Sequence, residues 1–529
     1  MEKVNDYKKR NKKIDNKIAL VLAILLIIPV IVYKKQVLIL SPKIMSNLYG
    51  TRIGNEYFNY YKLMGLIILS SLVLILFMYK LIALKYEIKN SNLNKFLVIL
   101  IFSILISFVL CDFKGIVMMG NSDRFEGVLA WICYTLIFFV TYNIEITKKN
   151  LKYFVFILVP FIIINFVLGV LKFYEVNVLN NGMVQILVGV VGGVEGSLWT
   201  TLYNPNFISG LSGALFISST VYIFLEENKK IKAGLLLLSL MMFTTVLTAL
   251  SLSGFVTIVV LFPIALIFVY RLGDKKELVK WLAILLACCS VIFVFFNKRN
   301  SAVWDNSLGF FVKLKSVQNY ISIKTVAIAV IALILLIVAY RFLSKKGMIK
   351  WLAVLLVCCS LIFVLKYTQT TSAYENNMKS KIETLNELST GRIHIWQKTI
   401  GLIKEKPLFG HGFDTLPYYL DHDDPASNGI IIDKPHNWFL TITYGTGIVG
   451  LVGVLGILWC LIKGIFKCWI DKVDDKVIYI TGAFIGGFIV QGMVNDTLVG
   501  TSIVFWVLAG ICANRLILCN AKKEDAEIN

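Results

Sequence analysis

The histidines are the first residues in this sequence whose type and spacing suggest chemistry. They are His394, His411, His422 and His436. All four fall within 43 residues of a 529-residue chain. A histidine near its unperturbed pKa can take a proton from a hydroxyl nucleophile, so it is a natural general base. His436 and Asn437 follow Pro435, which restricts the preceding residue to an extended shape and fixes the direction of the chain. A local helix-capping role for this pair is the alternative.

A second candidate is Arg392, at the start of a predicted amphipathic helix over residues 390–405. Apolar residues recur there at helical spacing after Thr390, the expected N-cap, and we expect Trp396 and Ile400 to be buried against protein or lipid. A helix N-terminus presents free N–H groups and a positive dipole end, and an arginine adds a bidentate phosphate donor. A solvated arginine at the membrane interface is the alternative.

Two polar motifs flank these residues in the same loop. Gly410 and Gly412 surround His411 in "PLFGHGFD", which permits tight backbone geometry near a ligand or a plain turn. "DHDD", from Asp421 to Asp424, has oxygen and imidazole ligands for a cation, but a solvated acidic turn explains it equally well. We therefore assign no metal site and no cofactor.

Three further polar clusters precede predicted spans. "NSDRFEG" contains Arg124 and Glu126, "YNPNFISG" offers Asn206 as an N-cap, and "SLSGF" at 251–255 makes a tight turn. The topology below predicts that all three lie on the same face as the histidine loop.

The composition indicates a polytopic helical membrane protein. The chain is 57% hydrophobic and 16% charged, against about 25% charged in soluble domains, and its mean hydropathy is +0.76. A net charge of +21 is spread over many loops, which fits positive-inside topology and anionic lipid rather than nucleic acid. The ten cysteines lie in or beside apolar runs, so we expect packing residues rather than disulfides or a metal site.

Hydropathy predicts fourteen spans. They are residues 18–33, 63–84, 96–111, 128–143, 153–172, 207–225, 233–250, 255–270, 281–296, 325–340, 351–367, 438–462, 477–495 and 503–518. Seven Lys/Arg precede the first span, which predicts a cytoplasmic N-terminus, and an even number of spans returns the C-terminus to the same side.

An internal repeat explains two of these spans. "KWLAILLACCSVIFVF" (280–295) recurs as "KWLAVLLVCCSLIFVL" (350–365), with twelve of sixteen positions identical at an offset of 70. We infer a twelve-span core plus one duplicated helix pair. The predicted organisation follows the chain. It comprises a basic cytoplasmic N-terminus (1–17), spans 1–11 (18–367, with the repeat at 255–296 and 325–367), an extracytoplasmic catalytic loop (368–437), spans 12–14 (438–518) and a cytoplasmic tail (519–529).

Residues 392–451, "RIHIWQKTIGLIKEKPLFGHGF…DKPHNWFLTITYGTGIVGL", resemble the signature region of the O-antigen ligase and polymerase superfamily. "DRFEG", "NPN" and "FWxLxG" match in order elsewhere. The resemblance implies an all-α GT-C-type bundle that moves a glycan from a polyprenyl-diphosphate carrier to an acceptor hydroxyl, with inversion and without a metal. The acceptor would be a glycan, lipid, wall polymer or protein.

The resemblance also implies roles for residues of this chain. His436 would be the base, Arg392 would hold the diphosphate and Arg124 would be a second cation. The supporting residues would be Trp396, Gly410, His411, Gly412 and Asn437. Many members carry Ser-Arg where this chain has Ser253-Gly254, so one family cation is missing or supplied elsewhere.

Four functions remain open on the sequence. The leading one is a ligase of lipid-linked glycans at the outer face of the cytoplasmic membrane, and a glycan-chain polymerase is the alternative. A flippase for the same lipid should place ionisable residues at mid-bilayer, whereas the span interiors here are nearly free of charge. A non-catalytic assembly scaffold would not need His436 and Arg392 to face one cleft.

Overall fold

The computed structural model describes residues 2–38, 53–122, 124–190, 198–303, 391–420 and 432–528. The chain divides into a large unit, Met1–Val303 with Trp396–Asn529, and a smaller unit, Trp304–Ile395. Only residues 391–395 of the smaller unit are described, so the following account concerns the large unit unless stated.

The described residues form an all-α membrane protein with one small hairpin. The helices are α1 (Glu2–Ile24), α3 (Tyr60–Ala83), α4 (Asn92–Leu110), α5 (Lys114–Met119), α6 (Val128–Asn143), α7 (Lys148–Phe173), α8 (Gly182–Leu187), α9 (Pro205–Leu225), α10 (Lys229–Thr248), α11 (Leu252–Leu272), α12 (Lys275–Arg299), α18 (Arg392–Glu405), α19 (Leu416–Tyr419), α20 (Trp438–Ile470), α21 (Lys476–Val494) and α22 (Val499–Ile528). Two 3-10 segments are η1 (Leu25–Val30) and η3 (Val178–Asn180), and β1 (Lys35–Leu38) pairs antiparallel with β2 (Ile53–Glu56).

The predicted spans coincide with these helices wherever the chain is described. Ten helices are long and apolar enough to cross a membrane, and α6 is a shorter apolar helix. The first predicted span is divided between the end of α1 and η1, where Pro29 interrupts the α-helical hydrogen bonds. The predicted spans at 325–340 and 351–367, and with them the second copy of the repeat, lie outside the described residues.

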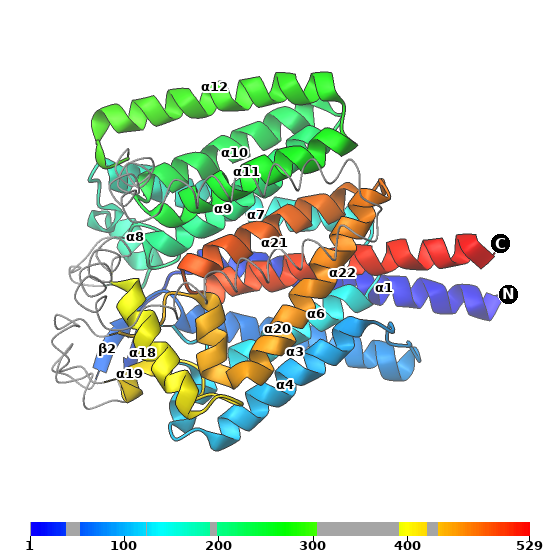
Figure 1. The fold of residues 1–529 in the computed structure, drawn as a ribbon, viewed down its shortest axis with the longest axis horizontal. Helices are drawn as coiled ribbons and strands as arrows, with labels where there is room; N and C mark the ends of the chain where they lie inside the picture. The colour runs from blue at the N-terminus through cyan, green and yellow to red at the C-terminus, as the bar shows by residue number, and fades with distance from the viewer. Residues whose placement is uncertain are drawn as a thin grey trace, which may run out of the picture. The chain divides into compact units, whose positions relative to one another are not determined.

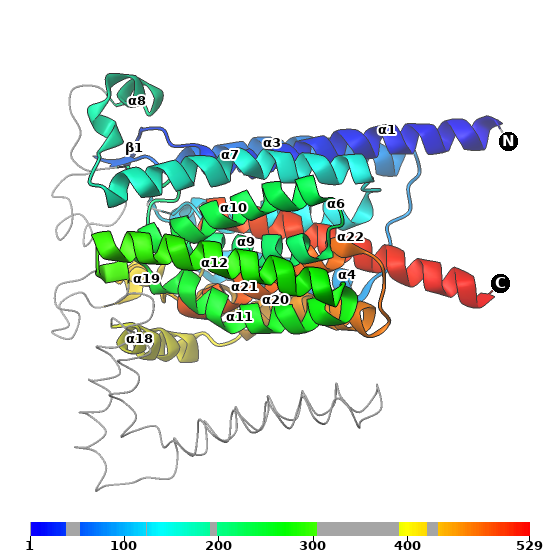
Figure 2. The ribbon, with the colours of Figure 1, turned by 90° about the horizontal axis from the view of Figure 1, so that it is seen from above.

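Both chain ends lie at one end of the helical body. Figure 1 shows the start of α1 and the end of α22 together, with β2 and α19 at the opposite end, and Figure 2 shows the same arrangement from above. This agrees with the prediction that both termini face the same side. We call the end with α19 the site end.

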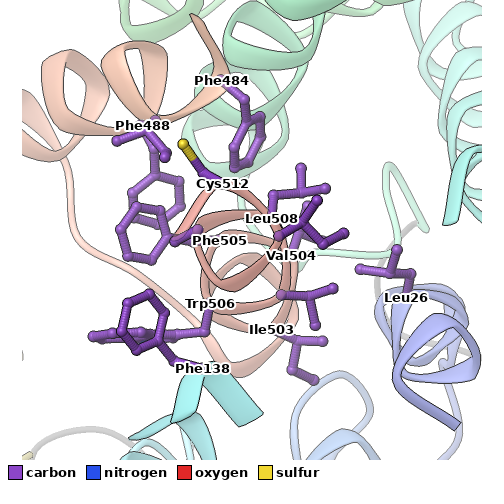
Figure 3. Close-up of a cluster of buried hydrophobic side chains, with 14 of the residues drawn as sticks. Leu26, Phe138, Phe484, Phe488, Ile503, Val504, Phe505, Trp506, Leu508 and Cys512 are labelled. Carbon is purple, nitrogen blue, oxygen red and sulfur yellow. The ribbon is translucent and has the colours of Figure 1, made fainter. Parts of the chain in front are cut away.

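The centre of the body is built around α22. Figure 3 shows its Phe505 and Trp506 on different sides of the helix, meeting Phe488 of α21 and Phe138 of α6. Phe505 stacks on Phe488 at 4.4 Å between ring centroids, and Trp506 meets Phe138 edge-on at 5.7 Å. Such aromatic pairs add to the stabilisation from burial. They hold α22 between α21 and α6 at the centre of the body.

Small residues let α9, α11 and α21 approach closely. A Cβ on Gly487 of α21 would lie 2.6 Å from Ala214 of α9, and one on Gly213 of α9 would lie 2.9 Å from the Gly254 carbonyl of α11. Close backbone approach through small residues is the usual way that membrane helices pack. By contrast, α12 is mostly exposed and apolar, as expected for a helix facing lipid.

Candidate active site

His436 lies at the site end, in the segment that leads into α20, beside a buried carboxylate. Its backbone is left-handed, with φ of +51°, a conformation in which histidine is enriched. Asp496 Oδ2 accepts the His436 backbone N–H at 2.9 Å and lies 3.3 Å from the ring Nδ1. The Asp496 side chain is fully buried, whereas that of His436 is 29% exposed. One ring nitrogen is therefore held by the protein, and the exposed part of the ring is accessible from outside.

Asp496 stays ionised because it collects donors and cations. Its Oδ1 accepts the Asn437 backbone N–H at 3.0 Å and the Thr441 hydroxyl at 2.8 Å. Burial alone would raise the pKa of Asp496, but the hydrogen bond from His436 and the charges around it lower that pKa well below its usual range. An ionised carboxylate on Nδ1 favours the tautomer with the proton there, which leaves Nε2 as the basic nitrogen.

Asn437 fixes the start of α20 against the end of α21. Its Oδ1 caps α20 by accepting the Leu440 N–H at 3.0 Å, and its Nδ2 donates to the Met493 carbonyl at 2.9 Å. The Trp438 N–H donates to the Asn495 carbonyl at 3.1 Å. Asn437 therefore takes the capping role and links α20 to the end of α21.

Arg124 is paired with a carboxylate of the same segment that carries His436. Its Nε donates to Asp433 Oδ2 at 3.1 Å and its Nη2 contacts the same oxygen. Burial would raise the pKa of Asp433, but Arg124 and His436 lower it overall, so this carboxyl stays ionised. The guanidinium also lies over the Phe207 ring of α9, 5.6 Å from its centroid, and its Nη1 is buried with no partner in the described residues.

Lys434 joins two more segments to the site. Its ammonium lies 3.3 Å from both Glu126 Oε2 and Asp414 Oδ1 and is buried with them. Burial would lower the pKa of Lys434, but these carboxylates raise it overall, so the ammonium stays protonated. Glu126 also accepts the Ser502 hydroxyl at 2.6 Å and the Thr497 hydroxyl at 2.9 Å. These contacts connect four segments of the chain, which are residues 120–127, 410–415, 432–437 and 495–502.

This cluster contains more acidic than basic side chains. The acidic members are Glu126, Asp414, Asp433 and Asp496, and the basic members are Arg124 and Lys434. A nearby excess of negative charge stabilises positive charge that develops beside it.

The two predicted glycines serve a backbone contact rather than an open ligand loop. Gly410 and Gly412 have φ of +70° and +94°, and a Cβ on Gly410 would lie 2.3 Å from the Tyr444 carbonyl. The helix α20 is kinked at Gly447, and the freed groups pair with residues 407–412: Tyr444 accepts from the His411 N–H at 2.8 Å. Glycine is needed on both sides of this contact because any side chain would separate the two backbones.

His411 is a structural residue in this packing. Its ring stacks on Tyr444 with centroids 5.2 Å apart, and its Nε2 lies 2.7 Å from the Leu402 carbonyl of α18. It is 1% exposed, and burial lowers its pKa. The ring joins α18 to the kinked part of α20.

The predicted amphipathic helix is present as α18, which begins at Arg392. The half-buried Trp396 donates from Nε1 to the Pro435 carbonyl at 2.8 Å, next to His436. Ile400 is not buried against the protein as predicted. Its side chain is 42% exposed, and the buried residue of this helix is Thr399. Arg392 belongs to the smaller unit and precedes Trp396 by four positions in the same helix.

Two further positions singled out in the sequence lie at the starts of α9 and α11. The helix α9 is capped by Asn204, whose Oδ1 accepts the Asn206 N–H at 2.8 Å, so the prediction that Asn206 is the cap is wrong by two residues. Pro205 explains the shift, because proline suits the first helical position. Gly254 packs so close to α9 that a Cβ would lie 2.5 Å from the Ser209 carbonyl, which explains why no arginine stands there.

His394 is half-buried in α18, whereas His422 and the Asp421–Asp424 turn lie outside the described residues. In the described ranges no three His, Cys, Asp or Glu side chains are grouped as a metal site would require.

The carboxylate that holds His436 belongs to no motif singled out in the sequence. Asp496 stands 60 residues further on, in "VNDT" before the last span, and nothing in that stretch predicts its partner. A polar Asn-Asp-Thr run between two apolar spans at the site end is the signal that could have suggested it. Asp433 and Lys434 lie in the "DKPHN" motif, but their partners also come from distant segments.

The fold and this site define a polytopic membrane protein with a His–Asp pair at one end of its helical body. Residues 320–455 match the family described as O-antigen ligase, a range that includes α18, residues 407–412 and His436. This match supports membership of the O-antigen ligase superfamily, a family of ligase- or polymerase-type membrane enzymes. No curated protein sequence matches it.

Proposed function

We propose that this chain transfers a glycan from a polyprenyl-diphosphate carrier to an acceptor hydroxyl at the outer face of the cytoplasmic membrane, with inversion and without a metal. The observation that carries the proposal is the partly exposed His436 held through Nδ1 by the buried Asp496. A histidine fixed by a carboxylate is a general base for a hydroxyl nucleophile.

The proposed step moves one proton and one glycan. The acceptor oxygen attacks the anomeric carbon from the face opposite the diphosphate, and the bond from that carbon to the diphosphate oxygen breaks. The hydroxyl proton passes to His436 Nε2, and polyprenyl diphosphate leaves. The acidic cluster around Asp496 stabilises the imidazolium that forms.

The diphosphate needs cations to hold its charge as the bond breaks. Arg392 is the proposed main ligand, since it stands at the N-terminus of α18, where backbone N–H groups and the helix dipole also favour an anion. Trp396, one turn later in the same helix, donates to the Pro435 carbonyl of the segment that carries His436. Arg124 would contribute through Nη1, because Asp433 occupies its other edge.

The test compares envelope glycans by mass spectrometry in cells that express the wild type, His436→Ala, Arg392→Lys or no protein. Loss of attachment of a glycan to its acceptor, in the null strain and in both variants, would identify a ligase. Shortened chains in the same three strains would identify the polymerase alternative. Unchanged glycans in the null strain, with the protein otherwise expressed, would contradict both.

A further inference from the structure

A pocket of about 490 Å³ lies at the site end, among the ends of α7, α9, α10 and α11. Its lining includes Asn204 and Asn206 at the start of α9, Asn300 after α12, and Trp199. None of these residues belongs to the His436 cluster. The volume is in the range of pockets that hold a small ligand, and nothing in the proposed reaction so far uses it.

The protein orients three of the four asparagine amides of this pocket in the same sense. Asn204 Oδ1 accepts the Asn206 N–H at 2.8 Å, Asn206 Oδ1 accepts the Ser251 hydroxyl at 2.5 Å, and Asn300 Oδ1 accepts the Ala302 N–H at 2.9 Å. Each side-chain oxygen is therefore engaged with the protein, and each NH₂ group is left without a partner in the described residues. The lining supplies oriented donors for a ligand rich in acceptor oxygens.

The remaining lining residues select against a strongly anionic ligand. Lys172 and Glu175 balance one another in formal charge, and the Lys172 ammonium lies over the Trp199 ring, 4.3 Å from its centroid. The indole is 41% exposed, so an aromatic face stands among the donors. Oriented amides together with an aromatic face suit a ligand that is polar at its edge and apolar on its face.

We infer that this pocket is a sugar-binding subsite, in which a pyranose places its ring and hydroxyl oxygens on the amides of Asn204, Asn206 and Asn300 and its C–H face against Trp199. The inference rests on the proposed function. The first turn of α9 connects the pocket to the proposed reaction site. Asn206 lines the pocket, and the ring of the next residue, Phe207, lies under the Arg124 guanidinium. The subsite would hold a sugar of the glycan away from the bond that reacts.

The test uses a substitution that removes only the hydrogen-bond donor of one amide. Asn204→Asp keeps an oxygen that caps α9, since aspartate is as good an N-cap as asparagine, but it replaces the NH₂ donor with an acceptor. Asn228→Asp is the matched control: Asn228 caps α10 in the same way, with Oδ1 accepting the Lys230 N–H at 2.9 Å, and it does not line the pocket. Trp199→Ala removes the aromatic face.

Saturation-transfer NMR on the purified full-length chain in detergent measures binding of methyl pyranosides of glucose, galactose, mannose, rhamnose and N-acetylglucosamine. We expect at least one sugar to bind the wild type and the Asn228→Asp and His436→Ala variants equally. Its affinity should fall about 2- to 10-fold in Asn204→Asp, which is the loss of about one net hydrogen bond, and further in Trp199→Ala. Retained binding by an inactive His436→Ala variant separates this subsite from the catalytic proposal.

A transfer assay with lipid-linked glycan extracted from the producing cells then distinguishes the two sources of the sugar. A raised KM for the donor in Asn204→Asp, with kcat within about twofold, would assign the pocket to the donor glycan, and a raised KM for the acceptor would assign it to the acceptor. The inference is overturned if no sugar of the panel binds the wild type, if Asn204→Asp and Asn228→Asp bind alike, or if neither KM changes.

Discussion

At the scale of single residues, the site depends on a carboxylate and an imidazole that are 60 positions apart in sequence. Asp496 is fully buried, yet it accepts hydrogen bonds from two backbone N–H groups and Thr441 and stays ionised. A buried ionised carboxylate that is not fully paired would be destabilising, so these donors are required for the fold as well as for the orientation of His436.

Asp496→Asn should lower the transfer rate by about 10²–10⁴-fold, because the amide cannot hold the tautomer with Nε2 basic. The amide also meets N–H donors, so the free energy of unfolding should fall by about 1–3 kcal/mol. Rate measurements below the melting temperature of the variant separate the two effects. A variant with full activity would show that Asp496 only packs.

His411 should make stability depend on pH. Burial lowers its pKa, so the folded state binds fewer protons than the unfolded state, whose histidine has a pKa near 6.5. Stability should therefore be complete above about pH 6.5 and fall as the pH drops below that value, by at most about 1.4 kcal/mol per pH unit. Thermal unfolding between pH 5 and 8 should be less pH-dependent in His411→Gln than in the wild type, and equal slopes would contradict this.

At the scale of elements, the kink of α20 and residues 407–412 form one structure. Gly447 has φ of +67°, and the N–H groups of Ile448 and Val449 donate to the Pro407 and Leu408 carbonyls at 2.9 and 3.3 Å. Non-helical backbone is acceptable near a membrane when protein satisfies it, and these contacts do so. The sequence motif with two glycines therefore pairs with a second glycine motif, "GTG" at 445–447.

Gly447→Ala should destabilise the protein by about 1–3 kcal/mol or more and reduce transfer, since its Cβ would lie 2.1 Å from Leu408 backbone. Gly401→Ala in α18 is the control: nothing lies within 4 Å of its Cβ, so we expect no loss and a gain of at most about 1 kcal/mol. Melting temperatures in detergent measure both. Equal melting temperatures for the two variants would refute the role given to the kink.

The elements were easier to predict than the contacts between them. Long apolar runs locate spans such as α6, predicted and observed at 128–143, because each run must bury itself in lipid or protein. The face of α18 was harder, since Ile400 and Thr399 differ by one position and the choice depends on what the helix meets. The pairing of Asp496 with His436 depends on the packing of α20 and α21, which no local pattern specifies.

At the scale of the whole molecule, the cluster around His436 lies at the site end, opposite the two termini (Figure 1). Arg124, His436 and Asp496 stand just before α6, α20 and α22, respectively. The inner loops are basic, as the positive-inside rule requires of a cytoplasmic face. This charge distribution supports the proposal that the reaction takes place outside.

Labelling of single cysteines in intact cells checks this orientation. In a chain with its native cysteines replaced by alanine, Met183→Cys on the exposed α8 should react with a membrane-impermeant maleimide. Glu227→Cys, before α10, should react only after the membrane is permeabilised. The reverse pattern would place the site in the cytoplasm.

The most direct measurement is the transfer rate of purified His436→Ala with a lipid-diphosphate glycan, together with binding of the donor to the same sample. We predict a rate about 10²–10⁴-fold below that of the wild type with donor binding unchanged, since a general base contributes to the reaction rather than to binding. A His436→Ala enzyme that transfers at the wild-type rate would contradict the account, because the geometry around Asp496 would then serve only the fold.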